Sequence, residues 1–273
     1  MPRNTARQTC LESRMIISPQ ETHANKRTDY FGNISYHFEI QTPHSELTIT
    51  AESLIDVAEL RTDLNNDLGI SYADALKLLK EMPSIDVIEA REFCLDSPMI
   101  KVNQELIDYA TPSFSLSRPL YTCVEELTSR IFTDFTYTPG FTNISTPLSE
   151  VLAHKKGVCQ DFAHLQIGCL RAMGIPAKYV SGYMETLPPP GQEKLVGADA
   201  THAWIAYYSP EDGWIEFDPT NDVRAGSKHI VTAEGRDYYD VTPLKGVIFG
   251  GGKSPILEVS VDVARKPEGV INR

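Results

Sequence analysis

Hydrophobic and polar residues alternate along the first part of the chain. The apolar positions of residues 34–40 are two apart, and residues 47–51 repeat this spacing after a Pro-His pair at 43–44. A period of two is typical of strands with one buried face, so we predict two strands joined as a hairpin. At residues 71–82 the apolar spacing becomes three to four, which predicts a helix that ends before Pro83.

The middle of the chain first follows a helical spacing. A stripe over residues 119–135 predicts one helix, and a second is expected with Thr146 as its N-cap and Pro147 at its first position. A third helix is predicted over residues 159–174. Because helices come first and strands afterwards, the predicted class is α+β rather than alternating α/β. The predicted strands are residues 178–183, 203–208 and 214–217.

The change of pattern indicates two domains. With 273 residues the chain can bury a full core and hold an additional domain. We predict a β-rich N-terminal domain over residues 1–98 and a catalytic core over residues 99–273, with a C-terminal strand at 256–263. The proline-rich segment 187–191 is expected to be a loop.

Composition narrows the classes of partner and compartment. The chain carries 25 basic and 37 acidic residues, a net charge of −12, which argues against a nucleic-acid partner. Five scattered cysteines without a C-x-x-C pair indicate neither a disulfide framework nor a zinc site, and fit reduced thiols. No apolar run approaches the roughly 20 residues of a membrane span, and the first residues lack the apolar core of a signal peptide. We therefore expect a cytoplasmic protein without a membrane partner.

One cysteine lies where a helix is predicted to begin. The segment KGVCQDFA at 156–163 places Cys159 in the first turn, where unpaired N–H groups and the helix dipole favour a thiolate. His202 in the segment ADATHAW and Asp218 in the segment GWIEFDPT follow downstream. A cysteine, a histidine and an aspartate can supply the nucleophile, the base and the orienting carboxylate for acyl transfer through a thioester.

Each of these residues has a distinct predicted role. A strand at 203–208 can present His202 to Cys159, and Asp218 on an adjacent strand can accept a hydrogen bond from the other imidazole nitrogen. The backbone N–H of Cys159 supplies one oxyanion donor. Trp204 is also expected to line a substrate groove. The candidates for the second oxyanion donor and for substrate contacts are Gln160, Tyr137 and Trp204.

Other patterns receive structural interpretations. Cys169 lies further along the inward face of the same helix and is interpreted as a small buried hydrophobe, and His164 as a structural or solvent-facing residue. Acidic residues at 63–74 resemble a calcium loop, but the glycine comes one position late. The glycines at 250–252 lack the spacing of a phosphate-binding loop.

Three segments of the second half resemble the core of the transglutaminase-like superfamily, in particular its bacterial cysteine peptidase group. They read GVCQDFAHLQIGCLRAMGIPAKYVSGY, ADATHAWIAYY and GWIEFDPTND, and the upstream segment DYFGNISYHFEIQTPHSELTITAES is similar to the accompanying β-rich domain. The resemblance implies a papain-like α+β core, with a nucleophile helix packed on an antiparallel sheet. It implies Cys159 as nucleophile, His202 as general base and acid, and Asp218 as orienter, with no metal or cofactor in the chemistry.

The resemblance leaves the reaction open. Superfamily members divide among protein crosslinking, amide or peptide hydrolysis, and non-catalytic proteins. We predict a thiol-dependent hydrolase of peptide or protein amides, with acyl transfer to an amine as the first alternative and a non-catalytic scaffold as the second. Relatives usually carry another strand before the region that matches residues 2–8, so the N-terminal domain is expected either to lack an edge strand or to have a misplaced start. The sequence does not predict the oligomeric state.

Overall fold

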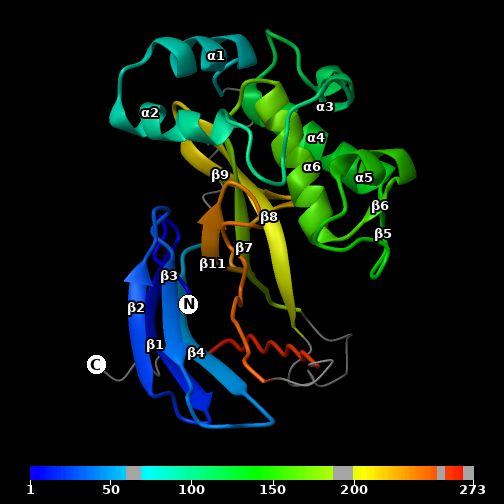
Figure 1. Cartoon of the computed structure of the whole chain (residues 1–273). Coiled ribbons are helices and arrows are strands. Elements are labelled where there is room, and N and C mark those ends of the chain that lie inside the picture. The colour runs from blue at the N-terminus through cyan, green and yellow to red at the C-terminus, as the bar shows by residue number, and fades with distance from the viewer. Residues whose placement is uncertain (60–68, 187–198, 251–255, 267–273) are drawn as a thin grey trace.

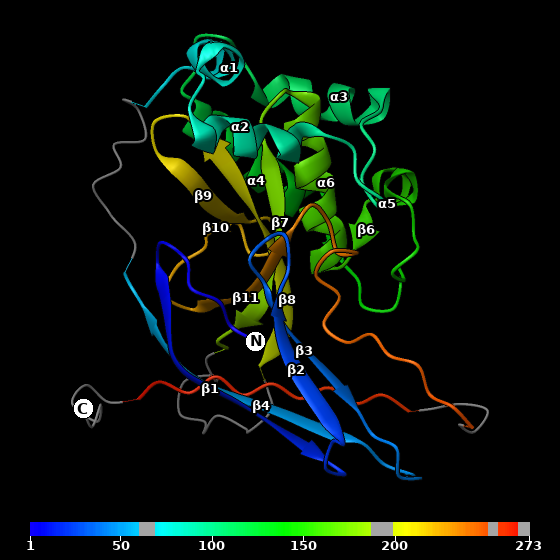
Figure 2. The same ribbon diagram turned by 60° about the vertical axis from the view of Figure 1, so that its left-hand side comes forward.

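A computed structural model of the chain describes residues 1–59, 69–186, 199–250 and 256–266. The predicted α+β class is confirmed. A five-stranded antiparallel sheet is packed against helices, and four N-terminal strands lie at the end of the molecule away from those helices (Figure 1, Figure 2). The pattern noted at residues 63–74, the loop at 187–191 and the glycines at 251–252 lie wholly or partly outside the described residues.

The N-terminal strands form two separate antiparallel pairs. These pairs are β1 (Gln8–Ser18) with β4 (Thr48–Val57), and β2 (His23–Thr28) with β3 (Ile34–Glu39). The predicted hairpin between β3 and β4 is therefore wrong, although both strands exist. Alternation identifies a half-buried strand but not its partner. The turn before β3 selects β2, because the Asp29 carboxylate accepts hydrogen bonds from the N–H groups of Phe31 and Asn33.

The predicted helical stripes appear as α1, α4 and α6. The start of α5 differs by one residue from the prediction, because Pro147 occupies the N-cap position and Thr146 does not. The Thr146 hydroxyl instead accepts a hydrogen bond from the N–H of Asn143. The described helices are α1 (Tyr72–Glu81), α2 (Ile85–Arg91), η1 (Glu92–Cys94), α3 (Gln104–Ala110), η2 (Thr111–Ser113), α4 (Leu120–Asp134), α5 (Leu148–His154) and α6 (Cys159–Ala172).

The main sheet has the strand order β10-β9-β8-β7-β11 and is antiparallel throughout. Two-residue strands β5 and β6 pair in parallel just before α6. The bounds are β5 (Thr136–Tyr137), β6 (Lys156–Gly157), β7 (Ala177–Met184), β8 (Ala200–Ser209), β9 (Gly213–Asp218), β10 (Val223–Arg224) and β11 (His229–Gly235).

Helix α6 lies at the centre of the hydrophobic core. Its residues 161–171 are all buried, and it packs against β7, β8 and helices α3, α4 and α5 (Figure 1). Leu165 and Leu170 share this core with Ile205 of β8. Because a helix enclosed in this way buries side chains around its whole circumference, its position on the sheet is fixed. The predicted packing of the helix that begins at Cys159 on an antiparallel sheet is confirmed.

Helices α1 and α2 belong to the same core, although they lie within the predicted N-terminal domain. Ala75, Val87 and Leu165 are members of one buried cluster. The β-rich character of the N-terminal region therefore ends with β4, and packing alone would group the following helices with the sheet. The division between residues 98 and 99 stays a prediction.

The predicted C-terminal strand at 256–263 does not form a ladder. Its regular pairing is limited to an isolated bridge between Val261 and Asp199. Ile256, Leu257 and Val259 are mostly exposed, so the apolar pattern that suggested a strand is not buried against a sheet. Within the described residues, the last strand of the sheet is β11.

The N-terminal strand region, residues 1–57, is attached to the outer edge of β11 by two buried amide side chains. Gln8 donates to the carbonyl of Val231 and accepts from its N–H, both at 2.8 Å. Asn33 does the same with Glu234, at 2.7 and 2.8 Å. Each amide therefore presents to β11 the donor and acceptor that a neighbouring strand would offer. These contacts hold in place the strand that begins at His229.

Candidate active site

Cys159 is the first residue of α6, and the residues around it fix that position. The Asp161 carboxylate accepts hydrogen bonds from the N–H of Val158 at 2.8 Å and the hydroxyl of Thr142 at 2.6 Å. The carboxylate thereby provides a hydrogen-bond acceptor for the backbone N–H of Val158, the residue that precedes the helix. A Cβ at Gly157 would lie 2.8 Å from the Asp161 side chain. Glycine is thus required at position 157, because the Asp161 carboxylate approaches it too closely for a larger residue.

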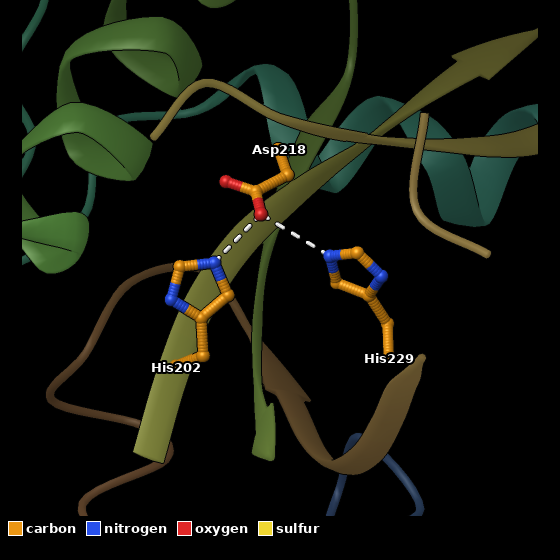
Figure 3. Close-up of side chains that lie close together, drawn as sticks. All are labelled: His202, Asp218 and His229. Carbon is orange, nitrogen blue, oxygen red and sulfur yellow. Dashed lines mark hydrogen bonds and ion pairs between the residues drawn. The ribbon is translucent and has the colours of Figure 1, made fainter. Parts of the chain in front are cut away.

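His202 on β8 and Asp218 at the end of β9 form a buried pair. Nε2 of His202 lies 2.7 Å from Oδ2 of Asp218, as Figure 3 shows. Asp218 is fully buried and His202 is 8% exposed. The short distance in a water-poor setting is typical of a charge-assisted hydrogen bond.

Asp218 is surrounded by donors. Its Oδ2 also lies 2.6 Å from Nδ2 of Asn221 and 3.1 Å from Nε2 of His229, and its Oδ1 accepts from the N–H of Thr220 at 2.9 Å. Burial alone would favour the protonated acid, but the hydrogen bonds from His202 and His229 outweigh it and hold the pKa of Asp218 well below its usual range. The carboxylate therefore stays ionised inside the protein.

The charge of His202 is set by the groups around it. Burial favours the neutral ring and lowers its pKa, but hydrogen bonds with Asp218 and with the Cys159 side chain outweigh burial and raise the pKa of His202 to about 9. The ring is therefore largely protonated near neutral pH. A protonated imidazole in this position can give its proton to a group that reacts at the cysteine.

Tyr137 lies near Cys159. Its strand β5 pairs with β6, where it stands opposite Gly157. Burial, followed by the negative charge of Cys159, raises the pKa of Tyr137, so its phenol stays protonated and able to donate. The ring is 52% exposed. Gln160 is half-buried in the first turn of α6. The oxyanion roles of Tyr137 and Gln160 stay predictions.

Trp204 does not occupy the position predicted for it. The residue is fully buried, and its Nε1 donates to Oε2 of Glu216 at 2.8 Å. Its ring packs among residues of the sheet and against Gly182, where an added Cβ would lie 2.5 Å from the indole. The prediction that Trp204 lines a groove or donates to an oxyanion is therefore corrected, because its donor is already paired and its ring supports β8 from within.

Comparison with known proteins identifies the family of this chain. Residues 108–219 match the transglutaminase-like superfamily, and residues 1–56 match the bacterial transglutaminase-like N-terminal region. An uncharacterized protein of Mycobacterium tuberculosis (strain ATCC 25618 / H37Rv) is 42% identical to this chain, over 96% of this chain and 84% of its own length. The chain belongs to the transglutaminase-like superfamily.

Other relatives show how far the likeness to this superfamily extends. An uncharacterized protein of Mycobacterium leprae is 33% identical over 97% of this chain and 89% of its own length. A protein-glutamine gamma-glutamyltransferase of Pseudomonas aeruginosa is 43% identical over 70 residues, which cover 25% of this chain and 10% of that protein. A crystal structure from Cytophaga hutchinsonii, described as a candidate cysteine protease, has a TM-score of 0.62 and 23% identity over 89% of this chain and 76% of that chain. This structural neighbour shares the fold.

Two residues of the cluster were missed by sequence reasoning. Asn221 stands three residues after Asp218 in the segment DPTND, where an Asx side chain near a strand end was a usable signal. His229 lies eleven residues beyond Asp218 at the start of the alternating segment HIVTAEG. Nothing in its spacing predicts a contact with Asp218, because that contact requires β11 to lie on the opposite side of β7 from β8 and β9.

Two further residues of α6, His164 and Cys169, have structural roles. His164 is buried, and its Nε2 accepts from the N–H of Tyr238 at 3.1 Å. Burial lowers the pKa of His164 to about 4, so it remains a neutral acceptor. Cys169 is fully buried, and burial raises its pKa to about 12. The structural interpretations of both residues are confirmed.

Metal binding was considered for the same cluster. Among the described residues, ligand atoms of His202, Asp218 and His229 lie within 4.8 Å of one another, close enough to share an ion. Both imidazoles, however, direct Nε2 at a single carboxylate oxygen (Figure 3). Nδ1 of His229 already accepts a hydrogen bond from Gly226, so its Nε2 carries the proton and is a donor rather than a lone pair. The arrangement favours a hydrogen-bonded cluster of His202, Asp218 and His229 over a metal centre.

Proposed function

We propose that this protein is a thiol-dependent hydrolase of peptide or protein amides. The observation that carries the proposal is the position of His202, which bonds Asp218 through Nε2 and contacts Cys159 at the first turn of α6. These two contacts support the roles of nucleophile for Cys159, base for His202 and orienter for Asp218.

The reaction follows from these contacts. The Cys159 thiolate attacks the amide carbonyl, and the oxyanion is held by the N–H of Cys159 together with Tyr137 or Gln160. The C–N bond breaks as protonated His202 gives its proton to the leaving amine, which leaves a thioester on Cys159. Neutral His202 then takes a proton from water, which attacks the thioester and releases the acid. Asp218 holds the ring in one orientation throughout and stays ionised.

Transfer to an amine is the second candidate function. The local likeness to the Pseudomonas aeruginosa protein-glutamine gamma-glutamyltransferase favours it. Both reactions share the Cys159 thioester and differ only in whether water or an amine captures it.

The test is a competition between water and an amine. The protein is incubated with a panel of glutamine-containing peptides and a labelled primary amine, and free acid and amine adduct are measured by mass spectrometry. We expect free acid to dominate at millimolar amine, and Cys159→Ala to form neither product. Dominant adduct would assign the transferase function, and absence of both products across the panel would favour a non-catalytic scaffold.

The proposed location is the reducing cytoplasm. All five cysteines are free in the structure, and a reducing compartment keeps the Cys159 thiol available. In the described residues no helix combines the length and apolarity needed to cross a membrane.

A further inference from the structure

His229 is a buried histidine to which the proposed reaction assigns no step. It is the first residue of β11 and is 4% exposed. Its Nε2 lies 3.1 Å from Oδ2 of Asp218, the same oxygen that bonds His202. Two imidazoles therefore meet at one carboxylate oxygen, each from a different direction (Figure 3).

The tautomer of His229 follows from its other nitrogen. Nδ1 accepts a hydrogen bond from the N–H of Gly226 at 3.2 Å, and the N–H of His229 donates to the carbonyl of Gly226 at 2.9 Å. A neutral ring whose Nδ1 accepts must carry its proton on Nε2. His229 is thus a hydrogen-bond donor to Asp218, and its own turn fixes the ring.

The two histidines differ in what they can do. His202 contacts Cys159 and can exchange a proton with the reacting groups, whereas both ring nitrogens of His229 are already engaged within the protein. The Trp204 ring packs against His229 in a T-shaped contact, with ring centroids 5.1 Å apart and an interplanar angle of 74°. His229 is therefore restrained on three sides.

We propose that His229 is a positioning residue that directs Oδ2 of Asp218 toward His202 and helps keep that carboxylate ionised. The inference rests on the proposed function, since it assigns a supporting role within the same triad. Among the described residues, the titratable groups that face His202 are Asp218 from β9, Cys159 from α6 and, through Asp218, His229 from β11. Without the His229 bond, Oδ2 is free to turn away from His202, so the hydrogen bond that holds the charged His202 ring should weaken and the pKa of His202 should fall.

The first test compares two substitutions at one position. His229→Leu removes the donor at similar volume, and His229→Gln keeps an N–H near the position of Nε2. We expect His229→Leu to lower kcat by about 10- to 100-fold with KM within about twofold, and to move the alkaline limb of the kcat/KM profile to lower pH. His229→Gln should recover most of the kcat and the parent alkaline limb.

A matched control separates positioning from general loss of packing. His164→Leu removes another buried histidine, one that bonds Tyr238 and not Asp218. It should lower Tm without moving the alkaline limb. Equal effects of His164→Leu and His229→Leu on kcat, in proportion to Tm, would overturn the inference.

A measurement on the unmodified protein covers the case in which His229→Leu does not fold. With 15N-labelled histidine, the ring nitrogen shifts report the tautomer of each residue at pH 7. We expect His229 to be neutral with its proton on Nε2, and a proton on Nδ1 would contradict the proposed donor role. Asp218→Asn distinguishes the two proposals: an unchanged kcat would defeat the triad itself, whereas loss of activity there with a fully active His229→Leu defeats only this inference.

Discussion

At the scale of single residues, burial raises the thiol pKa of three of the five cysteines. Burial raises the pKa of Cys94 to about 11 and of Cys169 to about 12, and it raises the pKa of Cys123 as well. Cys159 instead stands at a helix start beside a protonated histidine. We expect iodoacetamide near pH 6 to alkylate Cys159 faster than the other four, measured by peptide mapping. Equal labelling of several cysteines would contradict its role as nucleophile.

The orienting role of Asp218 can be tested against a neighbouring carboxylate. Asp218→Asn keeps the shape but removes the charge that holds His202, so kcat should fall by about two to four orders of magnitude with a smaller effect on KM. Asp222→Asn is the matched control, because the Asp222 carboxylate accepts a hydrogen bond from Ser129 and not from His202. Its kcat should stay near the parent value, and a larger loss in Asp222→Asn than in Asp218→Asn would exchange the two assignments.

The raised pKa of His202 predicts a pH window. The ring is protonated in the folded protein up to about pH 9, whereas its ordinary value is 6.5. Its contribution to the free energy of unfolding is therefore complete below about pH 6.5 and is lost as pH rises through 9. Activity should show an alkaline limb near pH 9, and chemical denaturation at a series of pH values should show stability falling over the same interval. An alkaline limb near pH 6.5 would mean that Asp218 does not hold the charged ring.

At the scale of secondary-structure elements, a single glycine determines how β7 packs. A Cβ at Gly182 would lie 2.0 Å from the carbonyl oxygen of Ile230 on β11 and 2.5 Å from the Trp204 ring. Gly182→Ala must therefore displace β11, and with it His229, so we expect a loss of about 2–4 kcal/mol in stability and a reduced kcat. Gly246→Ala, with nothing within 4 Å of its added Cβ, should stay within about 0.5 kcal/mol in urea denaturation. A neutral Gly182→Ala would show that β11 can move without cost.

The elements also show what sequence patterns can and cannot predict. The stripe from Phe162 to Met173 identifies α6, because an enclosed helix needs apolar residues at a fixed spacing. The alternation of β3 identifies a strand but not its pairing with β2, which depends on the turn at Asp29. The motifs around Cys159, His202 and Asp218 predicted which residues meet. The contact of His229 with Asp218 was not predictable, because it depends on the order of strands in the sheet and not on local spacing.

At the scale of the whole molecule, the N-terminal domain supports the sheet that carries the site. Gln8 satisfies both main-chain groups of Val231, two residues after His229. Gln8→Leu keeps the volume but leaves a buried N–H and carbonyl unpaired, so stability should fall by about 2–4 kcal/mol. Gln41→Leu is the control, because the Gln41 side chain is exposed and its amide donates to the exposed carboxylate of Glu39. Equal unfolding midpoints for the two variants would mean that the domain contact adds nothing to the sheet.

The same two amides have a consequence for how copies of the protein meet one another. An outer strand with open N–H and carbonyl groups is a template on which a second chain can add a strand and begin aggregation. On β11 those groups at Val231 and Glu234 are already taken by side chains of the same chain, Gln8 and Asn33. A further strand would pair these groups but would expose a new row of unpaired main-chain groups on its own outer side. Side-chain amides pair the same groups without exposing such a row. Detachment of Gln8 and Asn33 would therefore open these main-chain groups of β11 to pairing with a second chain, beside the candidate active site.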